Sequence, residues 1–141
     1  MSQDHLRAAG QLLGRLLLAA IFVHEGATLL KGYEPAARYM QAFGVPGLLL
    51  PAVIALQLPG GLLIVAGALT RITALAFAAF CLLTAVLFHT DFTVRGELLH
   101  FEKDLAIAGG FLLLAAVGPG RWSFEGWRSG LAEQAAGRHN P

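Results

Sequence analysis

The chain has 141 residues, of which 56% are hydrophobic and 17 more are glycine, while only 13% are charged and the net charge is +1. The charged share is about half of the roughly 25% found in soluble domains, so charged side chains are too few to cover a soluble surface. The single cysteine excludes a disulfide scaffold, the hydrophobicity excludes a disordered chain, and the balanced charge excludes a basic nucleic-acid binder. The composition therefore predicts an integral membrane protein.

Four hydrophobic segments follow one another along the chain, and each can form a helix that crosses a hydrocarbon core of about 30 Å. Their approximate bounds are 11–31, 47–69, 72–90 and 98–117. The second has Gln57 as its only strongly polar side chain, whereas the fourth reaches full length only by including the charged residues 102–104. We expect an all-α, antiparallel four-helix membrane bundle in residues 1–124, followed by a tail at 125–141.

The first hydrophobic segment contains ionisable side chains in both of its halves. Arg15 lies near its start, and His24 and Glu25 lie in its second half. Its centre, Leu16–Val23, has the length of a signal-peptide core, but no small-residue cleavage pattern follows it. A retained membrane span is therefore the better interpretation.

Basic residues predict the orientation of the bundle. Six arginines occur in the N-terminal region, the turn between the second and third segments, and the tail, against four basic residues in the other two loops. Because Lys and Arg favour the cytoplasmic side, this places both termini in the cytoplasm. Pro35 and the apolar spacing after it predict a short interfacial helix in the first outer loop, ending at Gly44, and Trp122, Phe124 and Trp127 predict an aromatic belt after the last span.

Ionisable side chains gather in the outer half of the predicted bundle. Such groups are costly at membrane depth and indicate a functional site by default, although hydrogen-bonded pairs such as His24–Asp104 or Glu25–His100 could simply fix helix register. Gln57 lies on the same face as Gly60 and Gly61, where small residues permit close helix approach. The candidate residues for binding a ligand or handling protons are His24, Glu25, Gln57, His89, Asp91, His100, Lys103 and Asp104.

Several kinds of chemistry fit this cluster. No tight metal-ligand spacing occurs, so we expect no metal site. Imidazole and carboxylate groups suit the binding of a quinone, with His24 and His100 as hydrogen-bond donors and Glu25 and Asp104 as proton acceptors. They also suit a path for protons or a small solute. The lone Cys81 is interpreted as a packed, unreactive thiol.

A set of short motifs extends over residues 11–124. They are Leu13-Gly14-Arg15, Phe22-Val23-His24-Glu25-Gly26, Tyr39-Met40, Gly44-Val45-Pro46, Gly60-Gly61, Leu69-Thr70-Arg71, Leu87-Phe88-His89-Thr90-Asp91-Phe92, the run from His100 to Gly110, and Gly118-Pro119-Gly120-Arg121-Trp122. Together they resemble the DoxX family of small bacterial inner-membrane proteins. The chain departs from the family pattern at Gln57, where Glu is usual, and at Asp104, where Asn is usual.

The resemblance implies a four-helix protein of the bacterial inner membrane. The family takes its name from a membrane subunit linked to quinone-dependent sulfur oxidation, and other members are associated with thiol redox balance and oxidative stress. We therefore expect a non-catalytic or accessory subunit that binds quinone or an oxidoreductase partner in the lipid bilayer, and that can form a homo-oligomer. The alternatives are a small proton or solute pathway and a purely structural partner of another membrane protein.

Overall fold

The computed structural model describes residues 2–137, and this part of the chain is helical throughout, without strands. The elements are α1 (Gln3–Lys31), α2 (Tyr33–Ala42), the 3-10 turn η1 (Gly47–Leu49), α3 (Leu50–Ala55), the π-helical turn η2 (Leu56–Gly60), α4 (Gly61–Ala66), α5 (Thr70–Phe88), α6 (Glu97–Val117) and α7 (Phe124–Gly137). The all-α prediction is confirmed. Residues 138–141 of the predicted tail, including Arg138, lie outside the described residues.

Three stretches of helix are long and apolar enough to cross a membrane. They are α1, the continuous stretch Gly47–Ala66, and α5. Helix α6 has 21 residues, but charged side chains occupy its first half, at Glu97 and residues 102–104. By length and composition, the structure therefore supports a membrane protein with several crossing helices.

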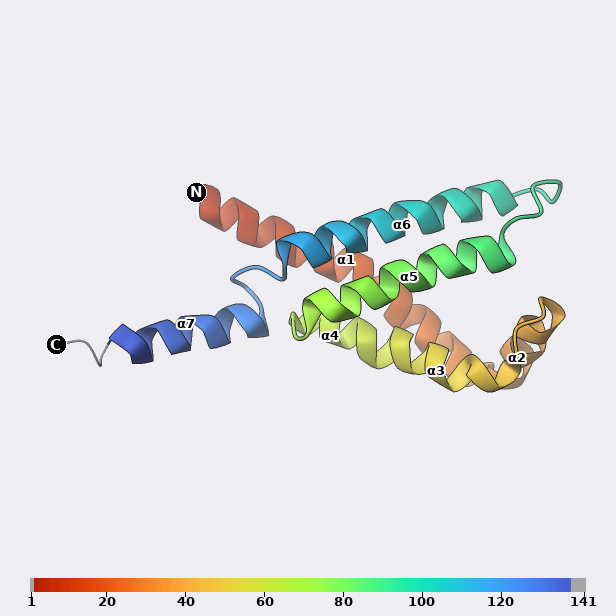
Figure 1. Cartoon of the computed structure of the whole chain (residues 1–141), viewed down its shortest axis with the longest axis horizontal. Coiled ribbons are helices and arrows are strands. Elements are labelled where there is room, and N and C mark those ends of the chain that lie inside the picture. The colour runs from red at the N-terminus through yellow and green to blue at the C-terminus, as the bar shows by residue number, and fades with distance from the viewer. Residues whose placement is uncertain (1, 138–141) are drawn as a thin grey trace.

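The helices run back and forth along the long axis of the molecule (Figure 1). α5 and α6 lie side by side as an antiparallel hairpin, α1 crosses behind them, and α3 to α4 return along α1. The left-hand end of Figure 1, where α1 begins and α7 lies, is called the α7 end. The opposite end, with α2 and the turn from α5 to α6, is called the α2 end.

The second hydrophobic segment is interrupted instead of forming one regular helix. Pro59 has no N–H group, so it cannot donate to the carbonyl four residues earlier, and the chain widens there into the π-helical turn η2. The turn includes Gln57 and buries it. The segment then ends at Ala66, three residues before the predicted boundary, in a turn where Gly67 and Leu69 both have positive φ.

A short helix, α2, is present where the sequence predicts one in the first loop. It begins at Tyr33, two residues before Pro35, and gives way at Phe43 to Gly44, which has φ of +74°. This left-handed conformation is the usual end of a helix at glycine.

Aromatic rings fill the centre of the molecule. The ring of Phe22 on α1 lies 4.5 Å from that of Phe77 on α5, and Phe77 stacks on Phe111 of α6 at 4.8 Å. Glycine lets α1 approach the interrupted helix: a Cβ at Gly26 would stand 2.9 Å from the Leu58 backbone nitrogen, and one at Gly61 would stand 2.7 Å from Val23. The predicted close approach at the small-residue face is confirmed.

Arg15 ties three elements together at the α7 end. It is 1% exposed, and its guanidinium donates to the carbonyl oxygens of Ile64 and Val65 at 3.4 and 3.3 Å and to that of Trp122. Ile64 and Val65 belong to the last turn of α4, where carbonyls lack the donor four residues later, although the Gly67 N–H also donates to Ile64. The charge near the start of the first predicted span thus caps the end of another helix.

Arg71 closes a second helix end in the same way. Its Nη1 donates to the carbonyl oxygens of Ala115 and Ala116 at 2.7 and 2.8 Å, in the last turn of α6. A cation at a helix C-terminus is also favoured by the helix dipole. Two arginines therefore stabilise the α7 end. Arg15 of α1 caps α4, and Arg71 of α5 caps α6.

Candidate functional site

A cavity of about 300 Å³ lies toward the α2 end, among α1, α2, the interrupted helix and α5. This volume is at the lower limit of the range of about 300–1,000 Å³ typical of small-molecule sites, and the lining is mostly apolar, as such sites are. The lining residues are Glu25, Leu29, Ala36, Tyr39, Met40, Leu50, Val53, Gln57, Phe80, Thr84 and Phe88. Two of the predicted candidates, Glu25 and Gln57, thus share one cavity.

Gln57 is the most deeply buried polar group of this cavity. Its side chain is 7% exposed, and its Oε1 atom has no hydrogen-bond partner among the described residues. A buried polar atom without a partner is costly, commonly by about 1–3 kcal/mol. The π-helical turn therefore holds an amide at the cavity wall with hydrogen-bonding capacity unused.

Tyr39 closes the cavity from α2. Its ring stacks on Phe88 at 5.8 Å and contacts Phe43 at 4.9 Å. Burial raises the pKa of the Tyr39 phenol, and the negative charge of Glu97 raises it further. Tyr39 is thus a neutral hydroxyl donor at physiological pH.

Thr84 links the cavity to α6. Its Oγ1 lies 3.0 Å from Oδ2 of Asp104. Asp104 is half-buried and outside the cavity lining, so it reaches the cavity only through the threonine hydroxyl. The structure therefore places this predicted candidate one hydrogen bond away from the cavity.

A second polar group lies beyond the end of α5. His89 Nδ1 is 2.7 Å from Oε2 of Glu97, and the His89 ring stacks on His100 at 5.1 Å. Asp91 lies in the following turn, where it accepts hydrogen bonds from the backbone and hydroxyl of Thr93. This group is distinct from the cavity lining.

The remaining candidates lie outside the cavity, and the expected hydrogen-bonded pairs do not form in the part of the chain that the structure describes. His24 and Lys103 are exposed. Among the described residues, Asp104 pairs with Thr84 in place of His24, and His100 stacks on His89 in place of meeting Glu25. Helical periodicity predicts which residues share a face of one helix, whereas the rotation of each helix decides which of them meet.

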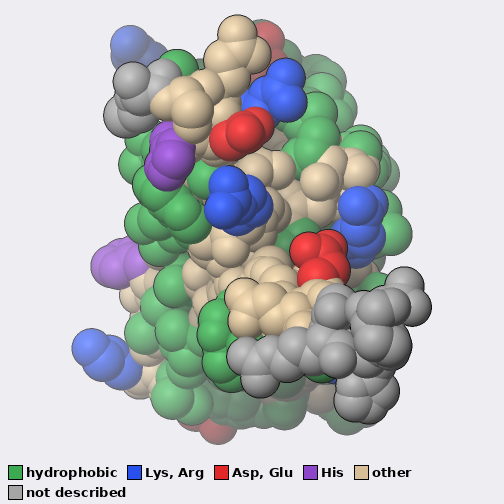
Figure 2. Space-filling model, turned by 90° about the vertical axis from the view of Figure 1, so that its left-hand side faces the viewer, with side chains coloured by type: hydrophobic (Ala, Val, Ile, Leu, Met, Phe, Trp, Pro, Cys, Tyr) green, Lys and Arg blue, Asp and Glu red, His purple; other side chains and the backbone are tan. Residues whose placement is uncertain are grey.

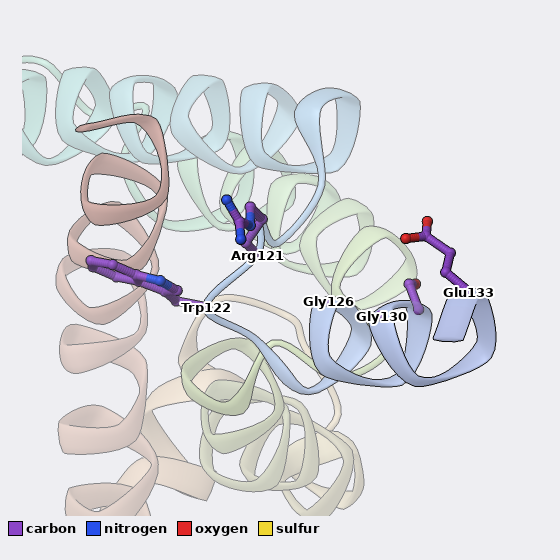
Figure 3. A pocket seen from close by; sticks show the side chains of 7 residues that line it. Arg121, Trp122, Gly126, Gly130 and Glu133 are labelled. Carbon is purple, nitrogen blue, oxygen red and sulfur yellow. The ribbon is translucent and has the colours of Figure 1, made fainter. Parts of the chain in front are cut away.

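A larger hollow of about 640 Å³ lies at the α7 end, between the loop after α6 and α7. Figure 3 shows Arg121 and Trp122 on the loop and Glu133 on α7, with Gly126 and Gly130 between them. Arg121, Trp122 and Glu133 are exposed. This hollow is a surface concavity and lacks the buried, unpartnered polar group that distinguishes the smaller cavity.

The comparisons with known proteins agree with the motifs. The DoxX family model matches residues 10–90, more than half of the chain. The chain belongs to the DoxX family. It is 48% identical over 120 residues to the inner membrane protein YqjF of Escherichia coli K12, covering 85% of this chain and 92% of that protein. It is 36% identical over 121 residues to the inner membrane protein YphA of the same organism, covering 81% and 86%.

No solved structure matches the chain. The DoxX membership, the inner membrane relatives and the apolar helices together show a multi-pass protein of the bacterial inner membrane, which sits in the lipid bilayer.

Sequence reasoning missed several residues of this DoxX cavity. Tyr39, Phe80 and Phe88 line it, but an aromatic side chain in an apolar segment carries no sequence signal for a cavity. Thr84 shares a helix face with Thr73, so the sequence indicates a polar face on this helix. It does not indicate which residue Thr84 contacts. The available signal for Gln57 was Pro59, two residues later, because a proline inside a hydrophobic segment disturbs the helix.

Within residues 2–137, no three His, Cys, Asp or Glu side chains come close enough to hold a metal ion.

Proposed function

We propose that the chain crosses the membrane four times, with α6 as the fourth span and both termini in the cytoplasm. The 21 residues of α6 reach about 31 Å at 1.5 Å per residue, which matches a hydrocarbon core of about 30 Å. Its charged first turns lie at the α2 end beside the turn from α5. Basic side chains, all of them arginines, are spread over the α7 end (Figure 2), which supports a cytoplasmic position for that end.

We further propose that the cavity at the α2 end binds the head group of a quinone. The observation that carries this proposal is buried Gln57, whose unpartnered amide oxygen lies at the wall of a cavity with aromatic sides. Phe80 and Phe88 offer flat apolar surfaces to a planar ring. A bound quinone would supply two-electron chemistry coupled to protons.

The residues of the chain can do the following at this site. The Gln57 amide nitrogen and the Tyr39 hydroxyl donate hydrogen bonds to carbonyl oxygens, and Gln57 Oε1 accepts from a hydroxyl group. Glu25 is the carboxylate that can accept a proton in the cavity. Gln57 and Tyr39 take the donor roles expected for His24 and His100, because Gln57 and Tyr39 line the cavity.

The DoxX chain would then act as an accessory subunit that holds quinone for an oxidoreductase partner. Such a role agrees with the quinone-linked membrane subunit that gives the family its name. The purified chain alone is expected to bind ubiquinone without changing its redox state, and ultraviolet difference spectra of quinone and quinol check this.

Binding itself is tested with short-chain ubiquinone added to the protein in lipid nanodiscs. We expect saturable binding and a rise in Tm, with Gln57→Leu and Glu25→Gln each weakening Kd about tenfold, the equivalent of 1.4 kcal/mol. Glu102→Gln, an exposed acid on α6, serves as the control and should leave Kd unchanged. Absence of saturable binding, or equal Kd in Gln57→Leu and the wild type, would exclude this function.

A further inference from the structure

The hydroxyl of Thr84 has two acceptors within reach but only one proton. Oγ1 lies 3.0 Å from the carbonyl oxygen of Cys81 and 3.0 Å from Oδ2 of Asp104. When Asp104 is ionised, Thr84 donates to the carboxylate. When Asp104 carries a proton, the carboxyl group donates to Oγ1 and Thr84 donates to Cys81. Both states use the same heavy-atom positions, so Asp104 can gain or lose a proton without rearrangement of the helices.

Thr84 lies between the cavity and Asp104. It is part of the cavity wall, whereas Asp104 is half-buried behind it on α6. A proton that leaves a donor in the cavity can form a new O–H bond at Thr84 as the existing Thr84 O–H bond breaks and its proton passes to Asp104. The numbers of O–H bonds and charges balance in this step.

Other ionisable groups continue from Asp104 toward the α2 end. His100 precedes Asp104 by one helical turn on the same face of α6. The His100 ring stacks on His89, and His89 Nδ1 meets Oε2 of Glu97 at 2.7 Å. His89 and Glu97 are 22% and 24% exposed, so this end of the series has access to the surroundings.

We propose that Asp104 is the proton-relay residue of the cavity, exchanging protons with it through Thr84 and with the α2 end through His100, His89 and Glu97. The identity of the proton donor in the cavity rests on the proposed quinone site. Asp104 acts through Thr84 and is therefore a positioning and relay residue. Its other ionisable neighbours are Cys81 on α5 and Lys103 on α6, and across the cavity stand Glu25 of α1 and Tyr39 of α2.

The first test is an infrared pH titration of the ligand-free protein in nanodiscs. We expect a carboxylic-acid C=O band that appears on acidification and is lost in Asp104→Asn but retained in Glu102→Gln. Thr84→Val should shift this band because the hydrogen-bond partner is gone, while Thr84→Ser keeps the hydroxyl and should leave the band in place. The role of Asp104 would be overturned if the Asp104→Asn spectrum lost no component of the C=O band, or if Thr84→Val left that component unshifted.

The second test measures how fast the Asp104 band shifts after transfer into D₂O. His100→Leu should slow this exchange at least severalfold, because it interrupts the series toward the α2 end. His24→Leu is the matched control, since His24 is an exposed histidine outside the series, and should leave the rate unchanged. Equal rates in the two variants would exclude the proposed route. Both tests are made without quinone, so the proton relay can be shown even where ubiquinone does not bind. Ubiquinone binding can likewise be shown even where the relay is excluded.

Discussion

The two ends of the molecule differ in how far their buried polar side chains are hydrogen-bonded. At the α7 end, the buried guanidinium of Arg15 donates to three carbonyl oxygens, and Arg71 closes the end of α6. At the α2 end, Gln57 keeps an amide oxygen without a partner beside a cavity. Arg15 Nε and the Thr70 hydroxyl also lack partners at the α7 end, so the contrast is one of degree: Arg15 donates from two nitrogens to three carbonyl oxygens, whereas the Gln57 amide oxygen accepts no bond among the described residues.

The strongest test of this contrast is Arg15→Met. The substitution keeps an unbranched side chain but leaves the carbonyl oxygens of Val65 and Trp122 without their donor, while Ile64 retains the bond from the Gly67 N–H. At about 1–3 kcal/mol for each of these two groups, we expect a loss of about 2–6 kcal/mol in unfolding free energy. Reversible denaturation in mixed micelles measures it. Arg7→Met, an exposed arginine on the same helix, should change stability little.

Gly26→Ala tests the packing on which the cavity depends. The added Cβ would stand 2.9 Å from the backbone nitrogen of Leu58, so α1 must move away from η2. We expect a destabilisation of about 1–3 kcal/mol together with weaker ubiquinone binding, because Gln57 lies in the same turn. Gly10→Ala adds a Cβ into open space and should affect neither quantity. An unchanged Tm in Gly26→Ala would contradict the close contact.

Glu125→Ala addresses the α7 end through a single hydrogen bond. Oε1 of Glu125 accepts from the backbone nitrogen of Thr70 at 2.8 Å, at the start of α5. Loss of such a helix cap typically destabilises by about 1 kcal/mol. Thermal unfolding and protease access to α7 would report it, with Glu133→Ala as the control. Equal effects of the two substitutions would show that the cap has no influence.

The smallest expected effect concerns Tyr39. Because burial and the charge of Glu97 both raise the pKa of this phenol, its tyrosinate should form above the ordinary value of about 10. Ultraviolet titration of a Tyr33→Phe background isolates the group. Glu97→Gln should lower the midpoint toward the ordinary value, whereas Glu34→Gln should leave it unchanged. A midpoint at or below about 10 in the parent protein would contradict the raised pKa of the Tyr39 phenol.

The helical class and the apolar segments follow from local information. Hydrophobicity over some 20 residues is a property of each segment alone, so the positions of α1 and α5 were accessible from the sequence. The interruption at η2 was also signalled locally by Pro59, but the direction in which it turns Gln57 depends on packing against α1.

The pairing of polar side chains was less accessible. Asp104 meets a threonine 20 positions away, and Arg15 meets carbonyl oxygens 49, 50 and 107 positions away. Carbonyl acceptors carry no side-chain signature, so the sequence shows Arg15 as an unpaired charge. The helix on which each candidate lies was predictable, whereas the partner of each depends on the rotation and crossing of whole helices.

The bond from Arg15 to Trp122 also has a consequence for biosynthesis. The acceptor is made 107 residues after the donor, which corresponds to about 5–20 s at the usual rate of translation of about 5–20 residues per second. During that interval the first helix enters the membrane while the Arg15 guanidinium lacks one of its acceptors. The side chain can then extend toward the lipid head groups, where the guanidinium is solvated. Synthesis of the loop between α6 and α7 then supplies the carbonyl that lets Arg15 become buried, so a loop made long after α1 determines when α1 reaches its final position.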